Sequence, residues 1–212
     1  MSTPEGPRSV KIGSDERGGW SSDRPRREGA PPRPADVSVR TRVLTPGDRM
    51  RYDPGSLLMV VSPSRAERDR FVQRVIEDRS AVLSLDKVRA LLAGRVPDED
   101  VEARAAELLD AATLKRLQAS ETVVLAAEGV SQEERDRFVR LAAGVPRPRH
   151  LILLEARRDE VAEEDRPVVN DLRRALDAGE LGSEGFHTSL RLGGATIDEV
   201  KRILFRAPPR DE

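Results

Sequence analysis

The chain of 212 residues has no cysteine, two histidines and very few aromatic side chains. Without cysteine it can form no disulfide, no thiolate metal site and no cysteine nucleophile. His150 and His187 are too few for a histidine-based metal centre, and we expect neither a metal nor a cofactor. Since aromatics make up only 3% of the residues, the core must be built from aliphatic side chains.

Long apolar runs are missing as well. No stretch approaches the ~20 residues of a membrane span, and the first residues lack the apolar centre of a signal peptide. We therefore expect a cytoplasmic protein that does not contact a membrane. The formal net charge is -1. That balance offers no global argument for nucleic-acid binding, although Arg is strongly preferred over Lys.

The first 36 residues are poor in large apolar side chains and include six Pro and five Gly. Such a segment buries too little surface to offset its conformational entropy, so we expect an irregular arm that is disordered unless bound. Trp20 would anchor this arm in an interface with a protein partner or a second copy of the chain. The alternative is a solvated leader that binds nothing.

Residues 37–55 are expected to form an edge strand and a turn. Val37 and Val39 begin an alternating pattern over 37–44, which suits a strand at a sheet edge or one donated to a partner. A turn follows at 45–48. We expect residues 56–206 to form one domain and residues 207–212 to be a tail.

From residue 57 onward, short apolar strands alternate with helices. The expected strands are 57–61, 81–83, 122–126, 151–154 and 188–192, and the expected helices are 65–78, 84–94, 98–119, 131–144, 167–178 and 196–205. This alternation predicts an α/β fold of three layers, a parallel sheet with helices on both faces. Leu108 is expected on the buried side of its helix, and Thr196 is expected to cap the last one.

In such a sheet, the ligand crevice lies at the carboxyl ends of the strands. We expect residues 62–68, 84–89 and 126–129 to converge there.

The stretch 56–71 has the frame of a phosphate-binding loop, namely a buried strand, a tight turn and a helix. In a working loop, glycines bring backbone N–H groups to the phosphates, a Lys reaches their far end and a Ser or Thr holds Mg²⁺. Here those positions carry other side chains: Ser62, Arg65 and Glu67 for Gly, Arg68 for Lys, and Asp69 for Ser or Thr. Side chains at the glycine positions obstruct the close approach of a pyrophosphate to the backbone.

Glu67 carries the strongest argument against phosphate binding. Ser64 and Glu67 have the spacing of a capping box, in which each side chain accepts a hydrogen bond from the other's amide. The anion at this helix N-terminus would then be the protein's own, and a nucleotide phosphate would meet a negative charge. The alternative is that residues 62–70 are an ordinary helix start that never bound phosphate.

Three further segments resemble polynucleotide 5′-kinases and related P-loop phosphotransferases. Ser84-Leu85-Asp86-Lys87-Val88-Arg89 is similar to their Ser-x-Asp-x-x-Arg segment, residues 122–130 with Arg135 are similar to their Val-Val-Asp-Ala-Thr-Asn-Val stretch and its downstream Arg, and Glu184-Gly185-Phe186 is similar to the Glu-Gly-Phe before their last strand. The likeness spans about residues 57–205. It implies a P-loop kinase-like fold, in which Asp86 would be the general base and Arg89 would contact a phosphate.

The departures from this pattern fall on the nucleotide-handling positions. Leu125 stands where the family has its acid, and Ala127 and Glu128 where it has Thr and Asn. Phosphoryl transfer depends on positioning and charge stabilisation by the loop backbone, the Lys and Mg²⁺. We therefore interpret the domain as a pseudoenzyme, a binding or structural module within a larger assembly that docks through its N-terminal arm.

Alternatives stay open for the function and for the two candidate catalytic residues. Asp86 also suits the first turn of any helix, and Arg89 can simply pair with a neighbouring acid. An active kinase would need Arg68 to grip phosphate in place of Lys, with Asp69 or Glu128 on Mg²⁺. A nucleic-acid-binding protein would use the arm and the groove near Arg89, although acids dilute the charge of that arm.

Overall fold

The computed structural model describes residues 41–157 and 159–206. Its strands are β1 (Arg42–Val43), β2 (Arg49–Tyr52), β3 (Leu57–Val61), β4 (Val82–Leu83), β5 (Val123–Ala126), β6 (Arg149–Leu154), β7 (Thr188–Leu192) and β8 (Arg202–Phe205). Its α-helices are α1 (Arg65–Val75), α2 (Leu85–Leu92), α3 (Asp98–Gln118), α4 (Gln132–Ala142), α5 (Arg166–Asp177) and α6 (Ala195–Glu199). Three short 3₁₀ helices, η1 (Arg79–Ala81), η2 (Glu163–Asp165) and η3 (Glu180–Gly182), complete the order.

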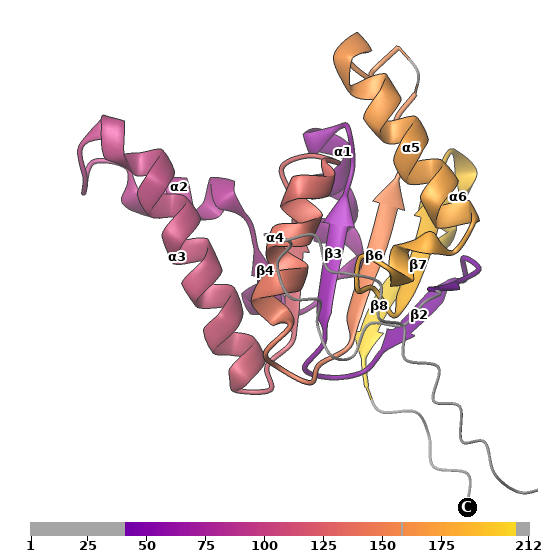
Figure 1. The fold of residues 1–212 in the computed structure, drawn as a ribbon, viewed down its shortest axis with the longest axis horizontal. Helices are drawn as coiled ribbons and strands as arrows, with labels where there is room; N and C mark the ends of the chain where they lie inside the picture. Colours follow the sequence, from indigo (N-terminus) through magenta and orange to yellow (C-terminus); the bar gives the residue numbers. More distant parts are fainter. Residues whose placement is uncertain (1–40, 158, 207–212) are drawn as a thin grey trace, which may run out of the picture. The chain divides into compact units, whose positions relative to one another are not determined.

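Six of the strands form a parallel sheet in the order β1-β7-β6-β3-β5-β4 (Figure 1). The central strand β3 is paired on both edges and covered on both faces, so all five of its residues are buried. This explains its continuous apolar sequence, since a strand with two covered faces has no polar side. The predicted α/β fold with a parallel sheet is confirmed.

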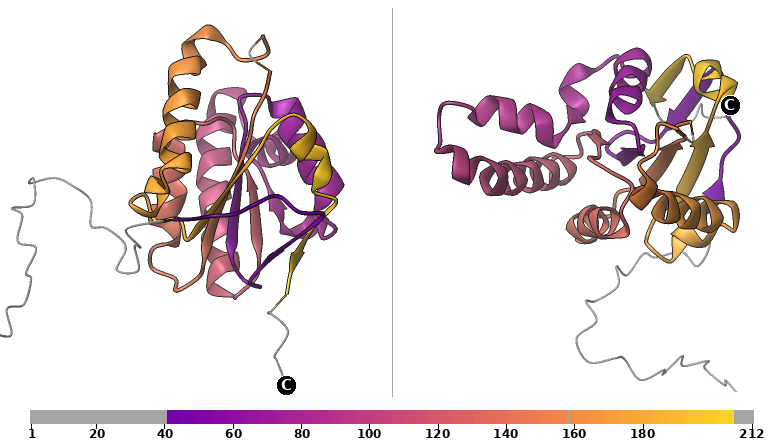
Figure 2. Two further views of the ribbon diagram at one scale, coloured as in Figure 1. Left: turned by 90° about the vertical axis from the view of Figure 1, so that its right-hand side faces the viewer. Right: turned by 90° about the horizontal axis from the view of Figure 1, so that it is seen from above.

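Helices cover both faces of this sheet (Figure 2). Alternate residues of a strand point to opposite faces. Leu57 and Met59 belong to the core that includes α3, α4 and α5, whereas Leu58 and Val60 belong to the core that includes α1 and α6. The predicted three-layer arrangement is therefore confirmed.

β2 and β8 form a second sheet of two parallel strands, which the sequence pattern did not predict. Its buried residues Met50, Tyr52 and Ile203 join the core on the side of α1 and α6. The prediction of one helix over residues 196–205 is wrong, because α6 ends at Glu199 and β8 follows. Pairing with β2 satisfies the backbone of β8, and this tertiary contact outweighs the local pattern.

Two finer predictions are also wrong. Gly194, not Thr196, is the N-cap residue of α6, and the Thr196 hydroxyl accepts a 2.8 Å hydrogen bond from the amide of Gly193 instead. Leu108 is 47% exposed although it was expected on the buried side of α3. α2 and α3 form a hairpin that extends beyond the sheet (Figure 1), so only part of α3 meets the core.

The strand expected over residues 37–44 is present at its end as β1, which forms one edge of the sheet and pairs with β7. The expected partner-binding residues Trp20, Val37 and Val39 lie outside the described residues, as do the rest of the arm and the tail at 207–212. Within the described part of the chain, no helix combines the length and apolarity that crossing a bilayer requires.

Candidate functional site

The candidate site lies between two neighbouring strands whose following helices pack on opposite faces of the sheet. β3 and β5 are neighbours, yet α1 after β3 packs on one face and α4 after β5 packs on the other. A crevice opens at the carboxyl ends of two such strands. Arg68 of α1 and Glu128 after β5 meet residues of α2 there, so the three segments expected to converge do lie together.

The turn after β3 is held by serine hydroxyls. Ser64 caps α1, and its hydroxyl accepts from the amide of Glu67 at 3.4 Å. The other half of the predicted capping box is wrong, because the amide of Ser64 donates to the Ser62 hydroxyl at 3.1 Å. The backbone amides of Ser64 and Glu67, which an open phosphate loop would turn toward its ligand, therefore donate to serine hydroxyls instead.

The Glu67 carboxylate stays at the start of α1 without returning to the Ser64 amide. One of its oxygens is buried and has no hydrogen-bond partner among the described residues. Burial, and next the charge of Glu160, raises the pKa of Glu67 above its ordinary value. A further negative charge beside this group would add to the same repulsion.

Arg68, at the position where the resemblance to a phosphate-binding loop places the Lys, turns into the protein. Its side chain is fully buried, and Nε and Nη2 donate to the Asp69 carboxylate at 2.9 and 2.7 Å. Nη1 donates to the carbonyl oxygen of Ala127 at the end of β5. The guanidinium thus ties α1 to the strand beside it, and Asp69 is committed to the same contact.

Arg89 forms the second centre of charge in the crevice. It donates to three carboxylates, those of Asp86 at 2.9 Å, Glu102 at 2.7 and 2.8 Å, and Glu128. The bonds to Glu102 and then Glu128 raise the pKa of Arg89 further above its ordinary value. The two candidate catalytic residues, Asp86 and Arg89, are therefore paired with each other one helical turn apart.

Glu102 is the neighbour of Arg89 that sequence reasoning missed, whereas Glu128, considered there as a Mg²⁺ ligand of an active kinase, is paired with arginines. Glu128 accepts from Arg89 and lies 3.5 Å from the Arg65 guanidinium, so it closes the crevice between α1 and α2. Glu102 reaches Arg89 because α2 and α3 run antiparallel around a short turn. In the sequence, Arg89 and Glu102 lie a similar number of residues before and after that turn, and this spacing is the feature that predicts their contact. Leu125, where the kinases that the sequence resembles have an acid, is buried in the core.

Two cavities border α1 beside the crevice. The larger has a volume of about 770 Å³ and lies between α1, the segment after β6 and α6, with Glu67, Arg70 and Arg157 on its wall. The other, about 490 Å³, is lined by Asp69, Asp86 and Lys87 among others. Burial, and next the charge of Arg79, lowers the pKa of Lys87. Both cavities present charges of both signs.

The remaining motif residues lie away from the crevice and hold the fold together. Arg135 is buried and forms a two-pronged pair with Glu184 at 2.8 and 2.7 Å, which fastens α4 to the segment before β7. Gly185 has φ +113°, and a Cβ there would lie 2.6 Å from a Val139 methyl, so only glycine fits. Phe186 is buried in the core. These contacts give the Glu-Gly-Phe segment a structural role.

No cluster of at least three His, Cys, Asp or Glu side chains within residues 41–157 and 159–206 has the arrangement of a metal site. The carboxylates of the crevice instead face guanidinium groups, with Asp69 on Arg68 and Glu128 on Arg89. The chemistry available in the crevice is therefore that of mutually neutralised ion pairs.

Comparisons with known proteins leave the family open. No family model and no curated protein matches the chain. Among solved structures, one that is similar is a Chloroflexus aurantiacus protein described as a "putative kinase". It shares 13% sequence identity over 69% of this chain and 88% of that protein, with a TM-score of 0.40.

Proposed function

We propose that this chain is a P-loop kinase-like scaffold without ATP-dependent catalysis, which serves as a binding or structural module in a larger assembly. The observation that carries the proposal is the placement of Arg68. The residue at the Lys position is fully buried and bonded to Asp69 and the Ala127 carbonyl. A phosphate clamp must extend toward solvent and the ligand, whereas this guanidinium supports the fold.

The neighbouring groups support the same reading. Backbone N–H groups and a helix N-terminus bind phosphate only when they are free and the local charge is positive. Here the Ser64 amide is used by Ser62, and the Glu67 carboxylate stands in the first turn of α1. Breaking the Arg68 contact to free a cation would leave the buried carbonyl of Ala127 without its donor.

A phosphorylation assay tests the loss of catalysis. The full chain is incubated with Mg-ATP labelled at the γ-phosphate and an oligonucleotide that ends in a 5′-hydroxyl. We expect no transfer above a protein-free control, and no difference between the wild type and Asp86→Asn. ATP-dependent transfer that disappears in Asp86→Asn would overturn the proposal and make Asp86 a general base.

The assembly role is tested through the arm. We expect the full chain to sediment as a complex with itself or with a captured protein partner, and Trp20→Ala to weaken that complex while the unfolding temperature stays the same. Val37→Ser and Val39→Ser are expected to act in the same direction, because the donated-strand interface would lose its apolar contacts. A monomeric wild type that captures no partner would contradict this part of the proposal.

A further inference from the structure

The two-stranded sheet of β2 and β8 presents a row of arginines to solvent. The register pairs Arg49 with Arg202 and Arg51 with Leu204. Since alternate residues share a face, Arg206 continues the same side of β8. All four arginines are exposed, whereas Met50, Tyr52 and Ile203 point into the core. We call Arg49, Arg51, Arg202 and Arg206 the ribbon arginines.

Most of this charge has no carboxylate to neutralise it. Among the residues that the structure describes, only Arg202 of the four forms an ion pair, with Glu77 at 3.0 Å. Arg49 and Arg202 stand directly opposite each other, and like charges in that position destabilise a sheet. Arg49, Arg51 and Arg206 therefore keep their charge available to a ligand outside the chain.

The chemistry of the patch favours phosphate groups as the ligand. Every cation in the row is an arginine, and the guanidinium fork matches two phosphate oxygens at once. Residues two apart on a strand lie about 6.6 Å apart, and the strands are about 4.8 Å apart, so the cations form a regular array. A polyanion with closely spaced charges can meet several of them together.

The burial of the aromatic side chains favours a duplex over a single strand as the polyanion. Proteins that hold unpaired bases stack them on exposed aromatic rings. Tyr52 is only 4% exposed, and its ring packs on His150 and Phe205 at centroid distances of 4.6 and 6.1 Å. The face of the ribbon that carries the arginines therefore presents guanidinium groups and no aromatic ring, which suits a duplex whose bases stay paired.

We propose that the ribbon arginines bind the phosphate backbone of a nucleic-acid duplex without sequence preference. A membrane surface fits the patch less well, because interfacial anchors combine basic residues with exposed large apolar side chains on an amphipathic helix. None of the exposed large hydrophobics of the described residues belongs to this sheet. The ribbon arginines make none of the ion pairs of the crevice, so this binding surface is separate from it.

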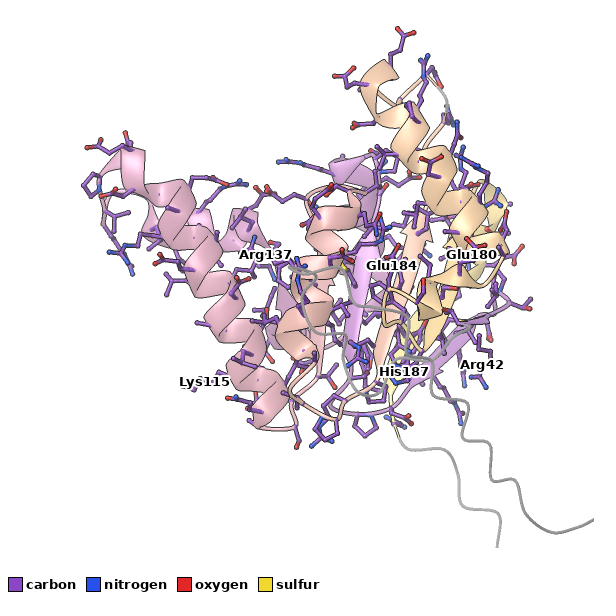
Figure 3. The ribbon with its side chains drawn as sticks, viewed as in Figure 1. Arg42, Lys115, Arg137, Glu180, Glu184 and His187 are labelled. Carbon is purple, nitrogen blue, oxygen red and sulfur yellow. The ribbon has the colours of Figure 1, made fainter. Side chains whose placement is uncertain are left out.

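Fluorescence anisotropy of labelled duplexes tests the proposal on the full chain. The variant carries Arg49→Gln, Arg51→Gln and Arg206→Gln. The matched control carries Arg95→Gln, Lys115→Gln and Arg140→Gln, three exposed cations elsewhere, of which Lys115 projects from the outer side of α3 (Figure 3). Both variants lose three positive charges, so a difference between them reports position and not net charge.

We expect the ribbon variant to bind duplex DNA or duplex RNA at least about tenfold more weakly than the wild type, and the control to bind like the wild type. The slope of log affinity against log salt concentration should fall by roughly one for each arginine removed. Duplex DNA alone, duplex RNA alone or both would support the proposal, and the comparison tells which backbone is preferred. The ribbon variant should melt no lower than the wild type, which separates lost binding from lost folding.

Three results would overturn it. The first is an equal loss of binding in both variants. The second is tighter binding of a single strand than of the duplex of the same sequence. The third is arginine-dependent binding to phosphatidylcholine–phosphatidylserine vesicles with no binding to either duplex, which would identify the ribbon as a lipid-binding surface.

Discussion

The crevice and the ribbon are both rich in arginine, but they treat its charge in opposite ways. In the crevice, Arg68 and Arg89 are surrounded by carboxylates from four different segments, namely α1, α2, α3 and the segment after β5. On the ribbon, Arg49 faces another arginine, and only Arg202 has a carboxylate partner among the described residues. One region neutralises its charge internally, and the other leaves it for solvent or a ligand.

This difference indicates where a charged partner can bind. A paired guanidinium must lose its partner before it takes up a phosphate, so its earlier contact competes with the ligand. An unpaired guanidinium has no such competitor. A fold of this kind places its ligand at the strand ends, but we expect no nucleotide to bind there. We expect a polyanion to bind to the small second sheet instead.

The largest effect should come from the buried guanidinium. Arg68→Ala leaves the Ala127 carbonyl without a donor and opens a cavity beside α1, so we expect a loss of roughly 3 kcal/mol. That corresponds to about 6–12 °C in the unfolding temperature. Arg65→Ala is the matched control, because its side chain is 56% exposed and should cost less than about 0.5 kcal/mol. Equal effects in the two variants would show that Arg68 is not the support inferred here.

Acidification should lower the stability of the fold through His150, whose ring packs on Tyr52 of β2. Burial, followed by the charges of His187, Arg42 and Arg149, lowers the pKa of His150 to about 3. Because the unfolded chain has the higher pKa of about 6.5, His150 contributes its full stability above that pH, and this contribution is lost as the pH falls toward 3. At about 1.4 kcal/mol per pH unit, we expect a loss of about 2 kcal/mol at pH 5.

Urea denaturation at pH 7.5 and pH 5 measures this loss. His150→Gln cannot titrate, so the difference in stability between the two pH values should be smaller in this variant than in the wild type. An unchanged difference would assign the pH dependence to carboxylates instead.

A smaller effect is expected at the mouth of the crevice. Glu128→Ala removes the carboxylate that pairs with Arg65 and one of the three that pair with Arg89. These pairs are partly exposed, and we expect a loss of about 1 kcal/mol that shrinks in high salt. Glu107→Ala, which breaks the exposed pair with Arg104, provides the reference for a surface contact. Thermal unfolding at low and high salt concentration distinguishes the two variants. A Glu128 variant that behaves like the reference would show that the ion pairs of Glu128 stabilise the fold no more than an exposed surface pair does.

The smallest effect has the opposite sign. Arg49→Gln removes a like charge directly opposite Arg202, and we expect a gain of about 0.2–0.5 kcal/mol. Arg51→Gln, opposite Leu204, should give little or no gain. Chemical denaturation of the two single variants makes this comparison. A loss of stability in Arg49→Gln would mean that the ribbon arginine serves the fold and not a ligand.

The main sheet could be predicted from the sequence because its strands are buried on both faces. Runs such as 57–61 and 151–154 are apolar throughout and require no knowledge of their partners. β2 and β8 could not be predicted in this way, since each is only four residues long and acquires its structure by pairing with a segment about 150 residues away. The apolar residues of 196–205 fit a helix and a strand equally well.

The candidate site was predictable in composition but not in geometry. The absence of glycine and the charge of Glu67 are visible in the sequence, as is the convergence of loops at strand ends. The direction of the Arg68 side chain depends on the Ala127 carbonyl, which only the folded sheet brings within reach. Glu102 likewise joins Arg89 only through the turn between α2 and α3.

The most direct measurement of the central claim is a thermal-shift titration of the full chain with Mg-ATP. A ligand at ~100 times its Kd adds ~2.7 kcal/mol to the stability of the state it binds, and each kcal/mol raises the midpoint by roughly 2–4 °C. Because Arg68 and the amide of Ser64 are already bonded within the protein, we predict no shift at millimolar nucleotide. A saturable rise of several degrees would contradict the account and show that the crevice still holds a nucleotide.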